Sequence, residues 1–169
     1  MQIRYVSSDD ELETDAVLGA VAARAASMGL RLCGTVQPLD AGKAVGACDI
    51  VLALLPDFQR RSISHDLPPD TSGCRLNPEA LEGVSAEVQD RLAGAQALIV
   101  NKFGRQEAVG RALVPVISAA CAQGLPVLVG VAPPWREAFL AFAGSEAQPL
   151  LADHDQVLAW LQQACLANA

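Results

Sequence analysis

Residues 95–111, AQALIVNKFGRQEAVGR, carry the pattern that decides the fold. The stretch opens with the short apolar run 97–100, which is typical of a buried strand. It then changes abruptly into the polar and charged segment 101–107. In an open α/β sheet, ligands bind just beyond the carboxyl ends of such strands, where loops and helix N-termini converge. The stretch therefore predicts an interior strand that leads into a candidate ligand site.

This segment is positively charged, whereas the whole chain has a net charge of −7. It contains three cations, Lys102, Arg105 and Arg111, and a single acid, Glu107. A local group of cations in an acidic protein suggests an anionic ligand. The alternative is a solvated loop that binds nothing, because charged loops are common on protein surfaces.

Length and composition limit the classes of protein to consider. We expect residues 1–169 to form a single domain, since 169 residues suffice for one well-buried core. The acidic balance argues against binding to nucleic acid or to an anionic membrane, both of which need a basic face. The chain shows no signal peptide and no apolar run of membrane-spanning length, so we expect a cytoplasmic protein with no membrane partner.

The first third of the chain predicts a parallel strand–helix–strand unit. Strands are expected at 3–7 and 31–37, with a helix that begins near Ser8 or Asp10 and ends at Gly29. We expect the buried face of this helix to carry four side chains: Leu12, Val17, Val21 and Met28.

The middle of the chain predicts an inserted hairpin followed by a helix. Residues 49–55 and 60–65 read as two strands joined by a turn, and 67–73 reads as a long loop. Asn77 has the properties of a helix N-cap, and the helix should run to Leu92. Its buried face is expected to carry Leu81, Val84, Val88 and Leu92.

The last third predicts alternating helices and one more buried strand, 126–131. Because Pro115 would break a helix begun at Gln106, we place the next helix at 112–122. A helix beginning at Pro134 and a final helix capped by Asp153 complete the chain. We interpret the aromatic spacing of Trp135, Phe139 and Phe142 as core packing. The whole pattern predicts an α/β fold with one doubly wound, mainly parallel sheet and an inserted β-hairpin.

Most of the chain resembles a bacterial family catalogued as a domain of unknown function, whose members are often encoded beside molybdate-transport genes. The matching residues fall mainly in segments 73–78, 99–107, 110–111, 124–128 and 142–144. This resemblance implies a link to molybdenum uptake or homeostasis and specifies no reaction. A more distant similarity connects the strand-end segment 101–107 to the thermophilic nucleoside-triphosphatase group of P-loop proteins. It implies a P-loop-like three-layer sandwich.

The first loop departs from the pattern of that group. A P-loop needs GxxxxGK[ST], whose backbone N–H groups and lysine hold phosphates. Residues 7–15, SSDDELETD, contain no glycine and no lysine but carry five carboxylates. At a few ångströms each carboxylate repels a phosphate by about 1 kcal/mol or more. Asn101 stands where the group has a magnesium-binding Asp. We therefore predict a degenerate Walker A segment that does not bind ATP or GTP in the P-loop manner.

Two loops supply the predicted anion site, and both should lie at the carboxyl end of the sheet. The predicted ligand-binding residues are Gly73, Cys74, Arg75, Asn101, Lys102, Gly104, Arg105 and Glu107. Arg75, Lys102 and Arg105 would form an electropositive corner in which Glu107 orients one of the cations. Alternatively, Arg75 and Glu107 form an internal ion pair that fixes the loops and binds nothing.

Cysteine and histidine chemistry contributes little to this hypothesis. The five cysteines are Cys33, Cys48, Cys74, Cys121 and Cys165, and their spacing fits neither a zinc site nor a disulfide framework. A nearby Arg or helix N-terminus would lower the pKa of Cys74, but no base partner is evident, so we expect a structural or ligand-contact role for it. No metal site is predicted, and His65 and His154 are expected at the surface.

Three classes of function stay open at this point. The first is a module that binds a small oxyanion, such as molybdate or tungstate, or a phosphorylated metabolite. The second is a nucleotide-related hydrolase or transferase that acts through Lys102, Arg105 and Glu107. The third is an adaptor whose acidic face meets a partner protein, and a homo-oligomer is also open. The sequence identifies no cofactor.

Overall fold

The computed structural model describes residues 2–38, 50–68 and 75–168. Within these ranges seven strands form one sheet: β1 (Ile3–Val6), β2 (Leu32–Val36), β3 (Val51–Leu55), β4 (Gln59–Ser62), β5 (Ala97–Phe103), β6 (Val127–Val131) and β7 (Gln148–Leu150). Their order is β4-β3-β2-β5-β6-β1-β7. The strands β2, β5, β6, β1 and β7, neighbours in this order, run parallel to one another. Strands β3 and β4 add an antiparallel hairpin beside β2, at one edge of the sheet.

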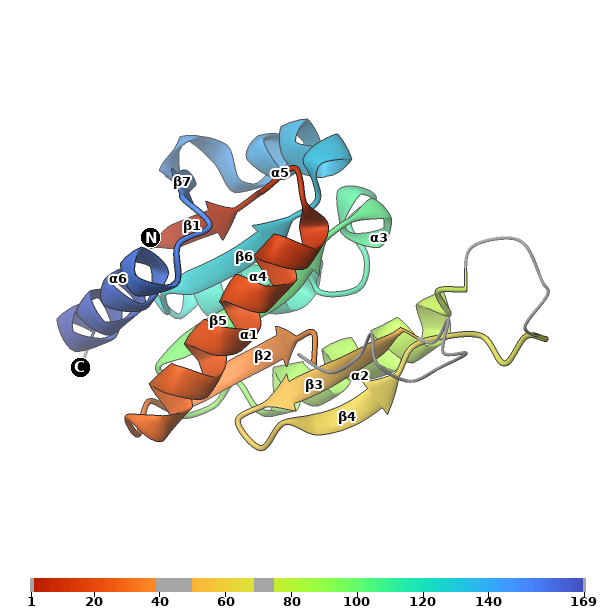
Figure 1. Cartoon of the computed structure of the whole chain (residues 1–169), viewed down its shortest axis with the longest axis horizontal. Coiled ribbons are helices and arrows are strands. Elements are labelled where there is room, and N and C mark those ends of the chain that lie inside the picture. The colour runs from red at the N-terminus through yellow and green to blue at the C-terminus, as the bar shows by residue number, and fades with distance from the viewer. Residues whose placement is uncertain (1, 39–49, 69–74, 169) are drawn as a thin grey trace.

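Helices cover both faces of this sheet (Figure 1). They are α1 (Glu11–Ser27), α2 (Pro78–Asp90), α3 (Arg105–Ala108), α4 (Val114–Ala122), α5 (Arg136–Ala143) and α6 (His154–Ala167), with short 3-10 turns η1 (Pro133–Trp135) and η2 (Gly144–Glu146). Helices α1 and α6 pack on one face, and α2, α4 and α5 pack on the other. The predicted α/β class, mainly parallel sheet and inserted hairpin are confirmed, and the architecture is a P-loop-like three-layer sandwich.

The centre of the sheet is the β5–β6 pair, as the apolar runs predict. Both strands lie in the interior and run parallel, with Ile99 opposite Leu128, and both residues are fully buried. The register shifts between Val100 and Phe103, so a bulge carries the polar end of β5. Gly130 makes the close approach there possible, because a Cβ at this position would lie 2.1 Å from the carbonyl oxygen of Asn101.

Three helix starts follow the predicted capping chemistry. Asp10 caps α1 by accepting a hydrogen bond from the backbone N–H of Leu12 at 2.9 Å. Asn77 caps α2 in the same way, with Pro78 in the first turn. Asp153 caps α6 through the N–H of Gln156 at 2.8 Å. These local signals therefore set where the helices begin.

The predicted buried face of α1 is partly wrong. Leu12 is 76% exposed and Met28 is 51% exposed. The helix instead buries Leu18, Val21, Ala22 and Ala25 against the sheet and α6. Alanines occur on every side of α1, so the large apolar residues alone did not define the face that packs.

The segment after Val100 also differs from its prediction. Residues 101–103 continue β5 instead of forming a loop, since β6 pairs with this strand as far as Phe103, which lies opposite Val131. The short helix α3 follows at once and was not foreseen. The proline at 115 falls in the first turn of α4, where it is tolerated.

The aromatic stripe of α5 packs into the core, with one ring at its margin. Phe139 is fully buried, with its ring centroid 5.2 Å from that of Phe103 and 5.2 Å from that of Tyr5. Phe142 stacks on Phe103 at 5.8 Å but is 39% exposed. Core packing is confirmed for this stripe.

Candidate functional site

A cavity of about 380 Å³ opens at the carboxyl ends of β2 and β5, beside the start of α2. The arrowheads of β1, β2 and β6 point toward this end of the molecule (Figure 1). Among the described residues, six aliphatic side chains line the cavity: Ile50, Leu52, Ile63, Leu76, Leu81 and Leu113. Its other lining residues are Asp15, Gln37, Asn101, Lys102, Gly104, Arg105, Gln106 and Glu107. This volume and this mixture of apolar wall and few polar groups are typical of a site for a small molecule.

Five of the predicted site residues line the cavity, namely Asn101, Lys102, Gly104, Arg105 and Glu107. Gly73 and Cys74 lie outside the described residues. Leu76, at the entry to α2, lines the same cavity as the end of β5. The start of α2 and the end of β5 therefore share one end of the sheet, as the crossover argument predicts.

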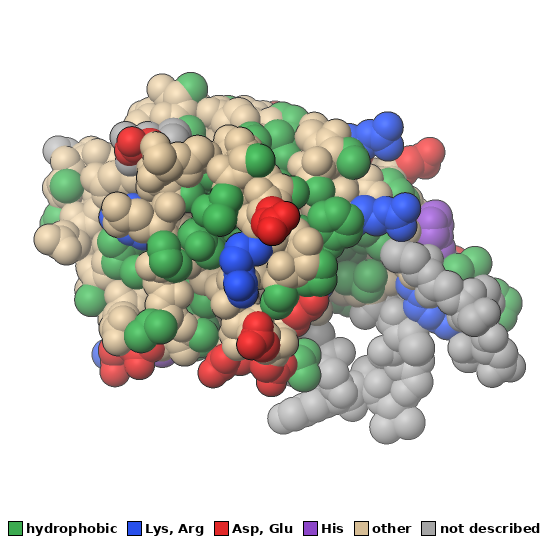
Figure 2. All heavy atoms as spheres, turned by 90° about the horizontal axis from the view of Figure 1, so that it is seen from above, with side chains coloured by type: hydrophobic (Ala, Val, Ile, Leu, Met, Phe, Trp, Pro, Cys, Tyr) green, Lys and Arg blue, Asp and Glu red, His purple; other side chains and the backbone are tan. Residues whose placement is uncertain are grey.

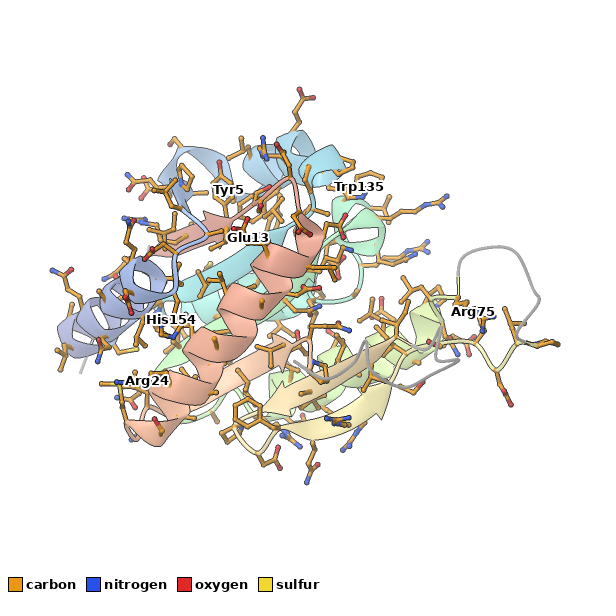
Figure 3. The ribbon with its side chains drawn as sticks, in the orientation of Figure 1. Tyr5, Glu13, Arg24, Arg75, Trp135 and His154 are labelled. Atoms are coloured by element: carbon orange, nitrogen blue, oxygen red, sulfur yellow. The ribbon has the colours of Figure 1, made fainter. Side chains whose placement is uncertain are left out.

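Arg75 is placed differently from its prediction. Its guanidinium donates to the backbone carbonyls of Pro68 at 3.1 Å and Leu67 at 3.5 Å. Its own carbonyl accepts a hydrogen bond from the N–H of His65 at 2.7 Å. Figure 3 shows Arg75 on the segment that leads into α2. Arg75 does not contribute to the described lining of the cavity, and its contacts hold the two chain segments before α2 together.

Asn101 is fixed at the floor of the site by a buried hydrogen bond. Its Oδ1 accepts from Thr35 Oγ1 at 2.8 Å, and the side chain of Asn101 is almost fully buried. Among the described residues the amide nitrogen of Asn101 has no hydrogen-bond partner, and none of the buried side-chain atoms is unsatisfied. This nitrogen is therefore a donor that remains accessible from the cavity.

Lys102 lies between the cavity and the first turns of α1. Its Nζ forms an ion pair with Glu11, and both side chains are about half exposed. Asp15 follows Glu11 by one helical turn and so lies on the same face of α1. Burial raises the pKa of Asp15 to about 6, an effect that the positive charge of Lys102 opposes and the negative charge of Glu11 reinforces. The polar end of the cavity thus contains a cation and a carboxylate that is costly to ionise.

Glu107 makes a local contact instead of orienting a cation. Its Oε2 accepts a hydrogen bond from the backbone N–H of Gly104 at 3.0 Å, which closes the first turn of α3. Burial raises the pKa of the Glu107 carboxyl, while hydrogen bonds from backbone N–H groups, that of Gly104 first, act in the opposite direction. No ion pair between Arg75 and Glu107 occurs in the described part of the chain. The alternative of a loop-fixing ion pair is therefore not what the structure contains.

The turn from β1 into α1 is closed by its own side chains. The N–H of Ser8 donates to Thr14 Oγ1 at 3.2 Å, and the N–H of Asp10 donates to Ser8 Oγ at 3.2 Å. The hydroxyl of Ser8 also donates to the carboxylate of Glu13. Figure 3 places Glu13 at this end of α1. Side-chain oxygens thus occupy backbone donors at the place where a P-loop would hold phosphate.

Arg136 from α5 reinforces this turn. Its guanidinium donates to Ser7 Oγ at 3.1 and 3.2 Å. The cation thereby fixes the end of β1 and is committed to a protein oxygen.

In the view from above, basic side chains stand out at the right-hand end of the molecule and acidic ones along its lower edge (Figure 2).

Other chemistries find little support in the described residues. No group of three or more His, Cys, Asp or Glu side chains there is arranged to hold a metal ion. Burial raises the pKa of the Cys33 thiol to about 11 and also raises those of Cys121 and Cys165, so these cysteines are poor nucleophiles. In the same residue ranges, none of the helices is long and apolar enough to cross a bilayer.

Sequence reasoning missed Asp15, Gln37 and Gln106 as lining residues. For Gln37 a signal was present, since it directly follows a strand and such positions lie at the ligand-binding edge of a parallel sheet. For Asp15 the signal was its spacing of four residues from Glu11. Neither signal tells that Asp15 and Gln37 lie beside residues 101–107 in one cavity.

Comparison with known proteins shows the family of this chain. A family described as protein of unknown function (DUF2478) matches residues 3–160, and the chain belongs to it. The chain is also 30% identical over 161 residues to the molybdenum import ATP-binding protein ModC 2 of Bradyrhizobium diazoefficiens. That match covers 94% of this chain and 17% of the relative, so the chain spans a minor part of the relative's length. No solved structure matches the chain significantly.

Proposed function

We propose that this DUF2478 protein binds a small organic anion, of the phosphorylated-metabolite class, in the cavity at the end of β5. The observation that carries the proposal is the combination of six aliphatic side chains with Lys102, Arg105 and the amide of Asn101 in one cavity of about 380 Å³. Cations and an amide donor suit a phosphate or carboxylate, and the aliphatic wall suits the carbon skeleton attached to it.

The same lining favours an organic anion over a bare oxyanion such as molybdate, tungstate or sulfate. A tetrahedral oxyanion has no apolar part that could cover Leu52, Ile63 and Leu81. The carboxylate of Asp15 would also repel such an oxyanion, which has no N–H group to donate to it. An organic ligand can place its charge near Lys102 and Arg105 and its remaining atoms against the aliphatic wall.

The proposal includes the loss of the ordinary P-loop function. The β1–α1 turn has no glycine, its N–H groups at Ser8 and Asp10 donate to side-chain oxygens, and Glu11 and Glu13 follow directly. A triphosphate in that position would need to break these hydrogen bonds and would face repulsion from the carboxylates. The name of the relative in Bradyrhizobium includes ATP binding, but the chain spans 17% of that protein.

A role connected with molybdenum follows from the same relative, whose name describes molybdenum import. In this proposal the domain senses or holds a metabolite within such a system. An enzymatic role for the 101–107 segment is less well supported, because the carboxylate of Glu107 is committed to the N–H of Gly104.

A thermal-shift screen tests the proposal. The compounds are molybdate, tungstate, sulfate, phosphate, ribose 5-phosphate, nucleoside monophosphates, ATP and GTP. A ligand at 100 times its Kd stabilises the folded state by about 2.7 kcal/mol, which raises the Tm by roughly 5 to 10 °C for a domain of this size. We expect organic phosphates to raise the Tm more than the inorganic anions do.

Two matched variants tie any response to the cavity. Arg105→Gln removes a cation that lines it, and Arg111→Gln removes an exposed cation six residues later that does not. Loss of the ligand response in Arg105→Gln, with its retention in Arg111→Gln, is the expected result. If no organic phosphate stabilises the wild type, or if both variants respond equally, the proposed site is wrong.

A further inference from the structure

Asp15 stands out among the cavity residues because an anion site gains nothing from a carboxylate. It lies on α1, lines the 380 Å³ cavity and also lines a smaller recess with Glu11, Thr14 and Lys102. Within the described part of the chain its carboxylate accepts no hydrogen bond. The side chain is half-buried, and burial raises the pKa of Asp15 by more than the positive charge of Lys102 lowers it.

We propose that Asp15 makes this cavity specific for a ligand that joins its anionic group to an edge of N–H donors, as a guanine-type base does. The inference rests on the proposed function, because it names the other half of the same ligand. Two neighbouring N–H groups would satisfy both oxygens of the carboxylate, which water and Lys102 alone leave poorly compensated. Arg105 would remain for the phosphate, together with Lys102 once Lys102 exchanges its ion pair with Glu11 for the ligand.

The polar groups around Asp15 fit such an edge. The amide nitrogen of Asn101, held in place by Thr35, is a donor. A 2-amino-6-oxopurine presents one acceptor, O6, beside two donors, N1–H and the 2-amino group. The acceptor would meet Asn101 and the donors would meet Asp15. Aliphatic side chains such as Leu52 and Leu81 would cover the faces of the ring.

An adenine edge fits the same groups poorly. It presents its 6-amino donor beside the lone pair of N1, and that lone pair would face the carboxylate of Asp15. A site built on donor groups rejects an analogue that lacks them because its own buried polar group is then left unpaired. The carboxylate of Asp15 should therefore favour guanine-type over adenine-type ligands.

Isothermal titration calorimetry tests the inference with guanosine 5′-monophosphate (GMP), inosine 5′-monophosphate (IMP), adenosine 5′-monophosphate (AMP) and ribose 5-phosphate. We expect the wild type to bind GMP at least tenfold more tightly than AMP or ribose 5-phosphate, with IMP between them because it lacks the 2-amino group. In Asp15→Asn the preference for GMP over AMP should fall below threefold. Binding of ribose 5-phosphate should stay equal or strengthen, since a repulsive charge has been removed.

The control is Asp90→Asn, which removes an exposed carboxylate at the end of α2, away from the cavity. It should keep the preference of the wild type. Asp15→Ser serves as a second variant, and circular dichroism confirms that each protein is folded. If the phosphates bind but GMP is not preferred, or if Asp15→Asn keeps the preference, the inference is wrong and the proposed function stands. If none of the compounds binds, both are wrong.

Discussion

Asp15→Asn should stabilise the free protein at neutral pH, which is unusual for a substitution at a half-buried position. The folded-state pKa of Asp15 is about 6, above the ordinary value of 3.8. The folded chain therefore binds this proton more tightly than the unfolded chain does. The stability that the protonated carboxyl contributes is complete below pH 3.8 and is lost as the pH rises through 6.

The size of the effect follows from the two pKa values. At about 1.4 kcal/mol per pH unit, their difference corresponds to an upper bound of roughly 3 kcal/mol. Solvent screening at this partly exposed side chain reduces the expected value to about 1 to 2 kcal/mol. Asn keeps the shape of Asp without the charge, so the variant should be more stable than the wild type by that amount at pH 7.5 and by only about 0.5 kcal/mol or less near pH 4.

Urea denaturation of both proteins at pH 4, 5, 6 and 7.5 measures the difference at each pH, so that titration of the remaining carboxyls cancels. Asp90→Asn, at an exposed position, should differ from the wild type by less than about 0.5 kcal/mol throughout. A variant that is less stable at pH 7.5, or one whose advantage does not change with pH, would refute the argument that burial makes the charge of Asp15 costly.

Three further changes test packing, capping and hydrogen-bond contacts of the fold. Gly130→Ala should cost about 3 kcal/mol or more in urea denaturation, because its Cβ would lie 2.1 Å from the carbonyl oxygen of Asn101, and a cost below 1 kcal/mol would contradict the close approach. Asp153→Ala should cost about 1 kcal/mol and lower the Tm, since the N–H of Gln156 loses its cap at 2.8 Å, whereas an unchanged Tm would show that the cap contributes nothing. Thr35→Val should cost about 1 to 3 kcal/mol in urea and weaken ligand binding, because a buried oxygen of Asn101 loses its donor, and unchanged binding would show that this contact does not position the amide.

The elements that could be predicted from sequence are those whose signals are local or very strong. The β5–β6 pair follows from two apolar runs too short and too uniform to be anything but buried strands. The caps at Asn77 and Asp153 follow from side chains that satisfy N–H groups two or three residues away. The hairpin follows from two strand-like runs around a turn.

The features that could not be predicted depend on which segments meet in space. The buried face of α1 is set by its contact with α6, more than a hundred residues later in the chain, and its alanines leave the choice open in sequence. Asp15 reaches the cavity because β5 and β6 lie between β1 and β2, so that α1 packs over these two strands and its first turns lie beside their carboxyl ends. The 101–107 segment could be identified because its charge pattern is local. The partners of Arg75 could not be identified, because the sequence does not tell whether a guanidinium binds a ligand or nearby backbone carbonyls.

The central claim is that organic phosphate binds beside the end of β5 and not at the β1–α1 turn. Backbone amide chemical shifts, followed by NMR during titration with ribose 5-phosphate and with GMP, test it most directly. We predict the largest changes at Lys102, Gly104, Arg105 and Leu76, all within or lining the cavity, with little change at Ser8. Changes concentrated at Ser8 and its neighbours in the turn, with the cavity amides unmoved, would contradict the account.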